Sequence, residues 1–226
     1  MNNHPLELKS DIKDLGVLVD EHLCFTKHIS EKVNKANQIM GLIRRTFTYL
    51  DKHNFNLLFK SLVRPHIEYA NTVWSPYLKS DINLIESVQR RATRYIPEVN
   101  KLSYADRLEC LKLPTLKYRR FRGDMIQTYK LLSNESRNGL FELKDSITRG
   151  HWLAVKTQTA KTKLRRNFFS VRVSHVWNSF PGHIVNAQSV NIFKNLLDEF
   201  CEMKNIIYNP EFDFHDTIAL SRILKT

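Results

Sequence analysis

The sequence is poor in the residues that an all-β protein needs at its turns. It has 6 glycines and 7 prolines among 226 residues, whereas a fold built from many short strands places these residue types at frequent turns. Hydrophobic residues make up 42% of the chain and charged residues 26%, fractions that are ordinary for a globular protein and do not indicate disorder. The composition therefore favours a mainly α-helical globular fold.

Cysteine is scarce as well, and its spacing suits neither a disulfide framework nor a zinc site. Cys24, Cys110 and Cys201 are odd in number and far apart, and none belongs to a CxxC half-site. The histidines that lie nearest to each other in the sequence, such as His22 and His28, are too far apart to share one turn of a helix. We expect three reduced cysteines, no metal and no other cofactor.

Long apolar runs and familiar catalytic motifs are also missing. No stretch reaches the roughly 18 apolar residues of a spanning helix, and the first residues, MNNHPLELKSDIKD, lack the apolar core of a signal peptide. There is no glycine-rich phosphate loop, no GxSxG and no HExxH. We expect no membrane partner, no small-molecule substrate, no catalytic residue confined to this chain, and a nuclear or cytoplasmic location.

Acidic residues are absent from a long central segment, although the chain as a whole contains 23 of them. The formal net charge is +12, which suits a polyanionic partner, with nucleic acid ahead of a membrane surface or an acidic protein. From Ser146 to Leu197 there is no Asp or Glu. The cations of that segment are Arg149, Lys156, Lys161, Lys163, Arg165, Arg166, Arg172 and Lys194.

Hydrophobic periodicity predicts a series of helices after a short N-terminal β element of one or two strands, which includes Leu6, Leu8 and the apolar run 15–19. The clearest signal follows Ser30, a potential N-cap, where apolar residues alternate at spacings of four and three. We expect inward-facing side chains at Ile29, Val33, Ala36, Met40, Ile43, Phe47 and Leu50. A second helix, capped by Asp51 and bent or ended at Pro65, should bury Phe55, Leu58, Phe59 and Leu62.

Five further helices are predicted downstream. One is capped by Ser80, buries Ile82, Ile85, Val88 or Gln89, Ala92 and Ile96, and stops at Pro97. A short one follows a capping box at Ser103, and another opens at Pro114-Thr115 with Tyr118, Phe121, Met125, Tyr129 and Leu132 inward. The last two lie within 167–180 and after Ser189.

The chain divides at a change in composition, the segment SNESRNG from Ser133 to Gly139. We expect a β element over 1–28, a helical domain over 29–132, a basic helical region over 133–203 and a loosely held tail over 204–226.

Three groups of basic residues are candidates for contact with nucleic-acid phosphates. Each group also has a simpler interpretation as a solvated helix face. The groups are Arg90, Arg91 and Arg94; Lys117, Arg119, Arg120 and Arg122; and Lys163, Arg165 and Arg166. The second group crowds the start of a helix, where positive charge opposes the helix dipole, which favours a functional role.

Several ordered blocks resemble one family, the reverse transcriptases of non-LTR retrotransposons of the jockey and CR1 type. The blocks are KDLGVLVD (13–20) with FTKHI (25–29), LVRPHIEYA (62–70) with VWSPY (73–77), IESVQRRATR (85–94), and NFFSVR (167–172) with VWNSFP (176–181) and Phe193-Lys194. Together they cover roughly Leu8 to Phe200. The resemblance implies the exit from the palm, a helical thumb-like bundle and a helical C-terminal extension, which together grip the primer-template duplex.

The resemblance also places the fingers and the catalytic palm before Met1. Two-metal nucleotidyl transfer needs at least two carboxylates held together, and the nearest likeness to the family's YADD motif, YANT at 69–72, has none. We therefore expect no polymerase activity from this chain alone, and binding of RNA, DNA or an RNA–DNA hybrid, with a palm domain as a second potential partner.

Two other functions compete with this interpretation. The chain could be a helical protein-interaction module with no nucleic-acid role, whose basic surface pairs with the palm or with an acidic protein. It could also be an independent nuclease or transferase, but the carboxylates that such chemistry needs are missing.

Overall fold

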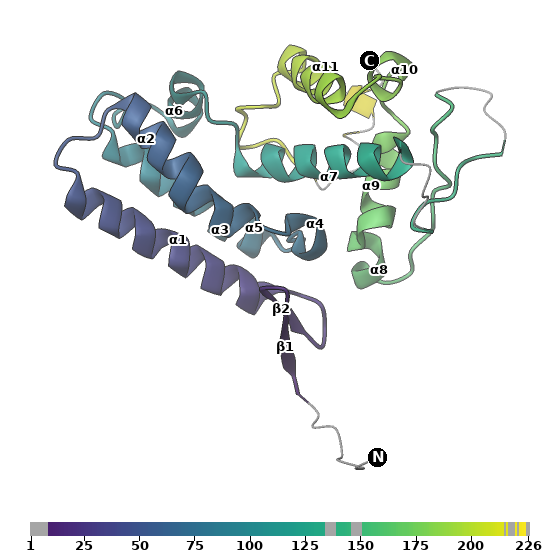
Figure 1. The fold of residues 1–226 in the computed structure, drawn as a ribbon, viewed down its shortest axis with the longest axis horizontal. Helices are drawn as coiled ribbons and strands as arrows, with labels where there is room; N and C mark the ends of the chain where they lie inside the picture. Colours follow the sequence, from purple (N-terminus) through teal and green to yellow (C-terminus); the bar gives the residue numbers. More distant parts are fainter. Residues whose placement is uncertain are drawn as a thin grey trace.

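The computed structural model describes residues 9–133, 139–145, 151–214, 216, 220 and 222–224. The described chain is mainly α-helical, as predicted, with a two-stranded β element at its N-terminal end that extends away from the helices (Figure 1). Leu6 and Leu8 lie outside the described residues, and so does most of the predicted break at 133–139.

The β element is an antiparallel hairpin of β1 (Asp11–Asp14) and β2 (Val17–Asp20), in which Asp14 pairs with Val17. Leu15 and Gly16 form its two-residue turn with φ values of 43° and 83°, and positive φ at both positions is the signature of a type I′ turn. The Tyr69 hydroxyl donates to the Leu15 carbonyl at 2.9 Å, and the Leu18 amide donates to Nδ1 of His28 at 3.1 Å. These bonds tie the hairpin to the helices.

The first group of helices buries most of the predicted seam. It comprises α1 (Thr26–Thr46), α2 (Lys52–Leu58), α3 (Arg64–Glu68), α4 (Asn71–Trp74), α5 (Lys79–Ala92) and α6 (Tyr104–Leu111). Phe47, which was predicted to face inward, is 42% exposed, because α1 ends at Thr46 and the backbone of Phe47 is extended. Two predicted starts were wrong: α1 begins at Thr26, before Ser30, and α5 begins at Lys79, so that Ser80 lies inside its first turn. Asp51 and Ser103 do cap their helices, each accepting a bond from the amide three residues on.

Pro65 does not end the second predicted helix. A π-helical turn, Phe59–Val63, joins α2 to α3, and Pro65 lies in the first turn of α3, where a missing N–H costs little. The wider turn inserts one residue, which shifts the buried face to Phe55, Phe59, Val63 and Ile67. Leu62, predicted to face inward, is therefore 46% exposed.

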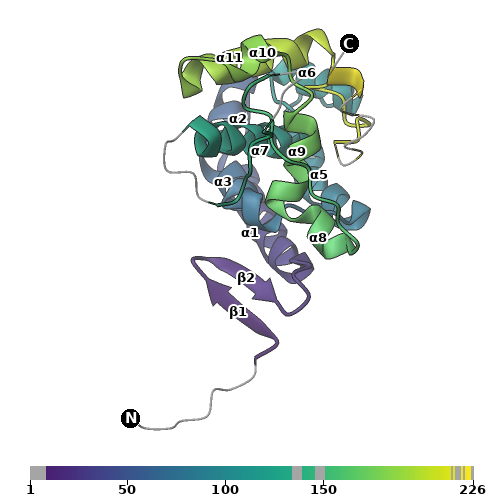
Figure 2. The same ribbon diagram turned by 90° about the vertical axis from the view of Figure 1, so that its right-hand side faces the viewer.

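The second group contains α7 (Leu116–Ser133), α8 (Lys163–Asn167), α9 (Phe169–Trp177), α10 (Gly182–Val185) and α11 (Val190–Met203). The two views show α7 running through the middle of the molecule, with α11 along one side and α9 crossing it (Figures 1 and 2). The inward residues predicted for α7 are all buried, and so are Phe169, Val173 and Phe180.

The hydrophobic core divides at the start of α7. Residues from Val17 to Leu116 form one cluster of buried side chains, and residues from Tyr118 onward form another. The helix α7 thus packs with the C-terminal region, although the predicted domains assigned it to 29–132. The described part of the predicted tail also differs from expectation, because Ile206, Ile207 and Phe214 are buried in the second cluster.

Candidate nucleic-acid interface

The first predicted group lies at the exposed end of α5 and in the 3-10 turn that follows, Thr93–Tyr95. Arg90, Arg91 and Arg94 are all exposed. The Arg90 guanidinium lies 4.7 Å from the centre of the Tyr104 ring, and Arg44, from the last turn of α1, lies 5.1 Å from the centre of the Tyr95 ring. We call Arg44, Arg90, Arg91 and Arg94 the arginine cluster.

A buried arginine holds this end of α5 in place. Arg107 donates to the Thr93 hydroxyl at 3.0 Å and to the Leu102 carbonyl at 2.9 Å. Burial lowers the pKa of Arg107, and the positive charges of Arg94 and Arg90 lower it further. The same charges add a positive field to the exposed surface above them, and such a field attracts polyanions.

Within the described part of the chain, no member of the arginine cluster forms an ion pair. Arg44 was not in any of the three basic groups predicted from the sequence. Its addition to the cluster depends on a tertiary contact with Tyr95, for which the sequence carries no local signal.

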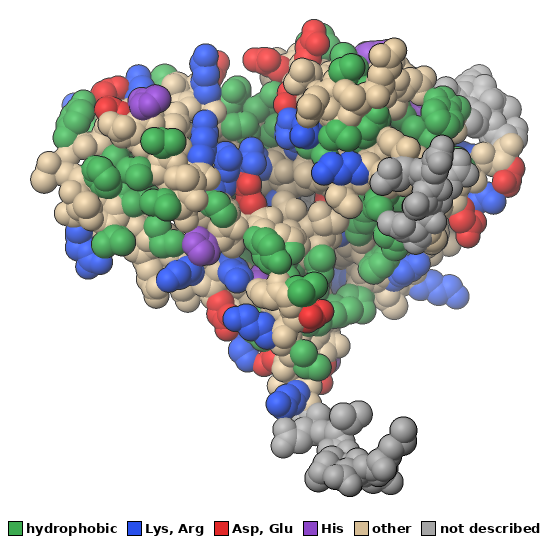
Figure 3. Space-filling view, in the orientation of Figure 1, with side chains coloured by type: hydrophobic (Ala, Val, Ile, Leu, Met, Phe, Trp, Pro, Cys, Tyr) green, Lys and Arg blue, Asp and Glu red, His purple; other side chains and the backbone are tan. Residues whose placement is uncertain are grey.

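The second predicted group, at the start of α7, is engaged with other parts of the protein. Arg119 donates twice to the Glu68 carboxylate, and Arg122 donates to the two carboxylate oxygens of Asp198 at 2.5 and 2.7 Å. Nζ of Lys117 donates to the Pro210 carbonyl at 2.7 Å. On the face seen in Figure 3, Lys and Arg side chains gather where α7 begins, with an acidic side chain among them.

Arg120, the fourth residue of that group, is buried. The structure therefore does not bring the four cations together on a solvent-exposed face, and each has a different environment.

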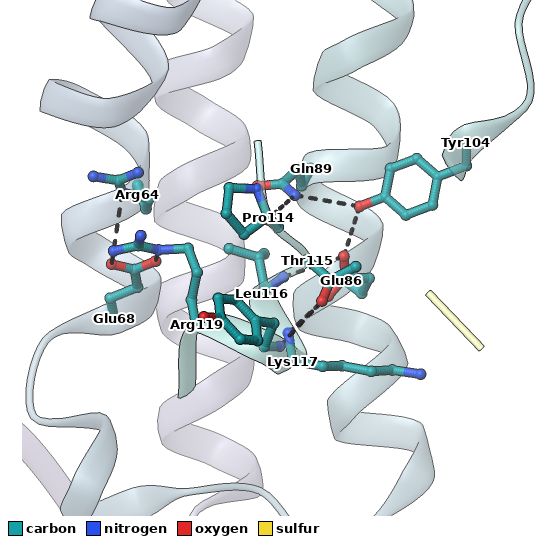
Figure 4. Close-up of polar contacts among 11 residues, drawn as sticks. Arg64, Glu68, Glu86, Gln89, Tyr104, Pro114, Thr115, Leu116, Lys117 and Arg119 are labelled. Atoms are coloured by element: carbon teal, nitrogen blue, oxygen red, sulfur yellow. Dashed lines mark hydrogen bonds and ion pairs between the residues drawn. The ribbon is translucent and has the colours of Figure 1, made fainter. Parts of the chain in front are cut away.

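A buried carboxylate explains how α7 tolerates cations at its start. Glu86 accepts bonds from the amides of Leu116 and Lys117, both at 3.3 Å, and from the Tyr104 hydroxyl at 2.6 Å (Figure 4). Burial and the Glu86 charge raise the pKa of Tyr104, so this hydroxyl remains a donor. A negative charge at the helix N-terminus stabilises the helix dipole and offsets the neighbouring cations.

The capping role of Glu86 was not predicted from the sequence. The hydrophobic stripe of α5 gives no sign that Glu86 caps a different helix, because that contact joins residues thirty positions apart.

The third predicted group, Lys163, Arg165 and Arg166, is exposed on α8. Nη2 of Arg165 donates to the Gln158 side chain at 2.7 Å, and its guanidinium lies 5.0 Å from the centre of the Phe168 ring. The helix α8 lies at the other end of the molecule from α6, which neighbours the arginine cluster (Figure 1). The two exposed groups therefore form separate basic surfaces.

The described residues show neither a metal site nor a membrane span. They contain no group of three or more His, Cys, Asp or Glu side chains able to hold a metal ion. No helix of that part of the chain is both long and apolar enough to cross a membrane.

The chain is similar to the "Uncharacterized protein B0403.1" of Caenorhabditis elegans. The two are 27% identical over 127 residues, which are 55% of this chain and 64% of the worm protein. The chain thus spans under two thirds of that relative's length. No protein-family model and no solved structure matches the chain.

Proposed function

We propose that this protein binds RNA, DNA or an RNA–DNA hybrid through backbone phosphates, with the arginine cluster as the principal contact. The observation that carries the proposal is the exposure of Arg90, Arg91 and Arg94 without an ion pair to any described residue. Guanidinium groups pair well with phosphate oxygens, and contacts to the backbone carry no sequence information. Binding should therefore tolerate changes in sequence.

The resemblance to non-LTR reverse transcriptases supports the same proposal. In that family the matching blocks belong to the thumb and the C-terminal extension, so we propose that this chain contributes grip on a primer-template duplex and not chemistry. A palm domain is then a second proposed partner, and residence in the nucleus or cytoplasm, where RNA and DNA are found, is part of the proposal.

A fluorescence-anisotropy titration with a labelled RNA–DNA hybrid tests the proposal. The wild-type chain should bind, and its affinity should fall steeply as salt rises, because each phosphate contact releases counterions. The triple variant Arg90→Gln, Arg91→Gln, Arg94→Gln should lose about 2.7 from the slope of log K against log salt, which is 0.9 for each phosphate contact. Circular dichroism should show that its helix content is unchanged.

A matched control removes the same charge elsewhere. Lys35, Lys79 and Lys130 are exposed, and Lys79 lies on α5 at the end opposite to the cluster. The triple variant Lys35→Gln, Lys79→Gln, Lys130→Gln should keep most of the wild-type slope. Equal losses in the two triple variants would mean that net charge, and not the arginine cluster, causes binding.

The competing proposal is a helical protein-interaction module, and one observation favours it. Leu57, Leu62 and Val73 are exposed by 61%, 46% and 60% on the α2–α4 segment. Contact through such side chains would depend little on salt. A folded chain that ignores the hybrid at low salt would favour this second function.

A further inference from the structure

A cavity of about 520 Å³ lies where α7 and α9 meet α8 and the C-terminal segment. Its lining includes Arg120, Phe121, Asp124, Arg166, Arg172 and Phe214. The volume is in the range of small-molecule sites, which hold most of a ligand's surface in one concave space.

The side chain of Arg120 is the unusual member of this lining. It is 4% exposed, and its Nη1 and Nη2 donate to no atom of the described residues. Glu86, Glu68 and Asp124 are near enough to favour its charge, whereas burial lowers its pKa. A buried guanidinium with unused donors is costly, since the donors lose their bonds to water and gain none in return.

One carboxylate of the lining, Asp124, already has a partner. Asp124 accepts bonds from Nε and Nη2 of Arg172, both at 2.9 Å, and these two side chains are 10% and 13% exposed. Arg172 thus satisfies Asp124, and Arg120 keeps two donors for another acceptor.

The charges of the lining favour a dianion. Lys117, Arg120, Arg166 and Arg172 contribute four positive charges, and Asp124 and Asp216 contribute two negative charges. The surplus is two positive charges. A phosphomonoester carries about −1.5 to −2 at neutral pH, whereas a single carboxylate carries −1.

An apolar wall stands beside these charges. The rings of Phe121 and Phe214 lie 5.0 Å apart, centre to centre, and both line the cavity. They offer contact to the organic part of a ligand, while the guanidinium fork of Arg120 matches phosphate oxygens in pairs.

We propose that this cavity binds a small phosphomonoester, up to the size of a mononucleotide, with its phosphate bound to Arg120 and Arg166. Sequence reasoning predicted no small-molecule partner, because no local motif marks a site assembled from five separated segments. The proposal does not depend on nucleic-acid binding by the arginine cluster.

Thermal unfolding of the full chain gives the first test. Inorganic phosphate and AMP are added at constant ionic strength, with chloride and adenosine as controls. Both phosphate compounds should raise Tm, with AMP active at the lower concentration, because a ligand that binds only the folded state stabilises it. A Tm that responds equally to phosphate, AMP and chloride would overturn the proposal.

Calorimetric titration with AMP then tests the residues. Arg166→Gln should weaken binding by about tenfold and Arg120→Met by about thirtyfold or more, given a charged hydrogen bond of about 1.5 to 3 kcal/mol. The matched control is Lys161→Gln, which removes an exposed charge next to the lining residue Ala160. Its affinity should stay within about twofold of wild type.

If Arg120→Met fails to fold, Arg166→Gln still tests the proposal. Arg166 is exposed, so its substitution should leave the fold intact. Equal affinities of Arg166→Gln and Lys161→Gln for AMP would contradict the assignment. A parallel titration with an oligonucleotide bearing a 5′-phosphate or a 5′-hydroxyl separates two sources of the group. If only the phosphorylated strand requires Arg166, the bound phosphomonoester is a strand end and not a free nucleotide.

Discussion

Two basic stretches look alike in the sequence, the end of α5 and the start of α7, but they differ in exposure and ion pairing in the structure. Arg90, Arg91 and Arg94 remain exposed, whereas Arg119 and Arg122 each bind a carboxylate from a distant part of the chain. The difference follows from how much of each helix is covered. Neighbouring helices contact one side of α5, but α7 lies between the two hydrophobic clusters and packs over most of its circumference.

Cations on a central helix are surrounded by other parts of the protein, so most of them bind an acceptor within the fold. Among the four cations at the start of α7, Lys117, Arg119 and Arg122 have acceptors within the protein, whereas Nη1 and Nη2 of Arg120 have none in the described residues. Exposed cations on a peripheral helix are hydrated and need no partner within the protein. They are therefore the better candidates for binding an external anion. Substitutions of the two kinds of cation, and of the groups around them, should therefore differ in their effect on the free energy of unfolding.

The largest effect should come from the buried ion pair of α7. Asp124→Asn should lower the free energy of unfolding by about 3 to 5 kcal/mol, because Arg172 would keep a buried charge without its partner. Urea unfolding monitored by circular dichroism measures the change. The double variant Asp124→Leu, Arg172→Met should recover most of the loss, and a loss below about 1 kcal/mol in the single variant would contradict the pairing.

Neutralising the carboxylate that caps α7 should rank second. Glu86→Gln should destabilise the protein by about 2 kcal/mol, since it weakens two bonds to helix amides and removes a negative charge beside the helix N-terminus. The exposed Glu109 provides a control, because Glu109→Gln should change the free energy by less than about 0.5 kcal/mol. Similar values for the two variants in urea unfolding would rule out the capping role.

The paired cations of α7 should follow. Their partners are partly exposed, so Arg119→Gln and Arg122→Gln should each cost up to about 1 kcal/mol. Neither should change the affinity for an RNA–DNA hybrid by more than about twofold, because both side chains are engaged within the protein. A strong loss of hybrid binding with unchanged stability would place these residues on the binding surface instead.

Acidification should loosen the hairpin. Burial lowers the pKa of His28 below the ordinary value of 6.5, and Lys32 adds to the shift. As the pH falls below about 6.5, the unfolded chain binds a proton that the folded chain does not, so the free energy of unfolding decreases. His28→Asn retains an acceptor for the Leu18 amide and should flatten this dependence between pH 7 and pH 5. An unchanged slope in urea titrations would contradict the role of His28.

Much of the fold could be predicted because the signals are local. The seam from Ile29 to Ile43 and the caps at Asp51 and Ser103 depend only on periodicity and on side chains within one turn. The exposure of Leu62 could not be predicted, because the π-helical turn that rotates the buried face has no clear sequence signature. The division of the core at the start of α7 also depends on tertiary packing and not on composition.

For the candidate sites, the sequence predicted which basic residues to consider but not which partners they bind. Exposure of the α5 arginines followed from the apolar stripe beside them, which was correctly placed. The partners of the α7 cations could not be foreseen, since Glu68 and Asp198 lie 51 and 76 residues away from Arg119 and Arg122. A sequence shows where charge is, but the pairing of charges is a property of the folded chain.

Substitution of Arg91 should have the smallest effect on stability, and its effects should be opposite to those of substituting Arg119. Arg91 is exposed and has no ion pair within the described chain, so Arg91→Gln should change the free energy of unfolding by less than about 0.5 kcal/mol. The same change should remove about 0.9 from the salt slope of hybrid binding, the contribution of one phosphate contact. Arg119→Gln should do the reverse, lowering stability and leaving the slope intact. If both variants moved the slope equally, the difference between peripheral and central cations would not explain binding.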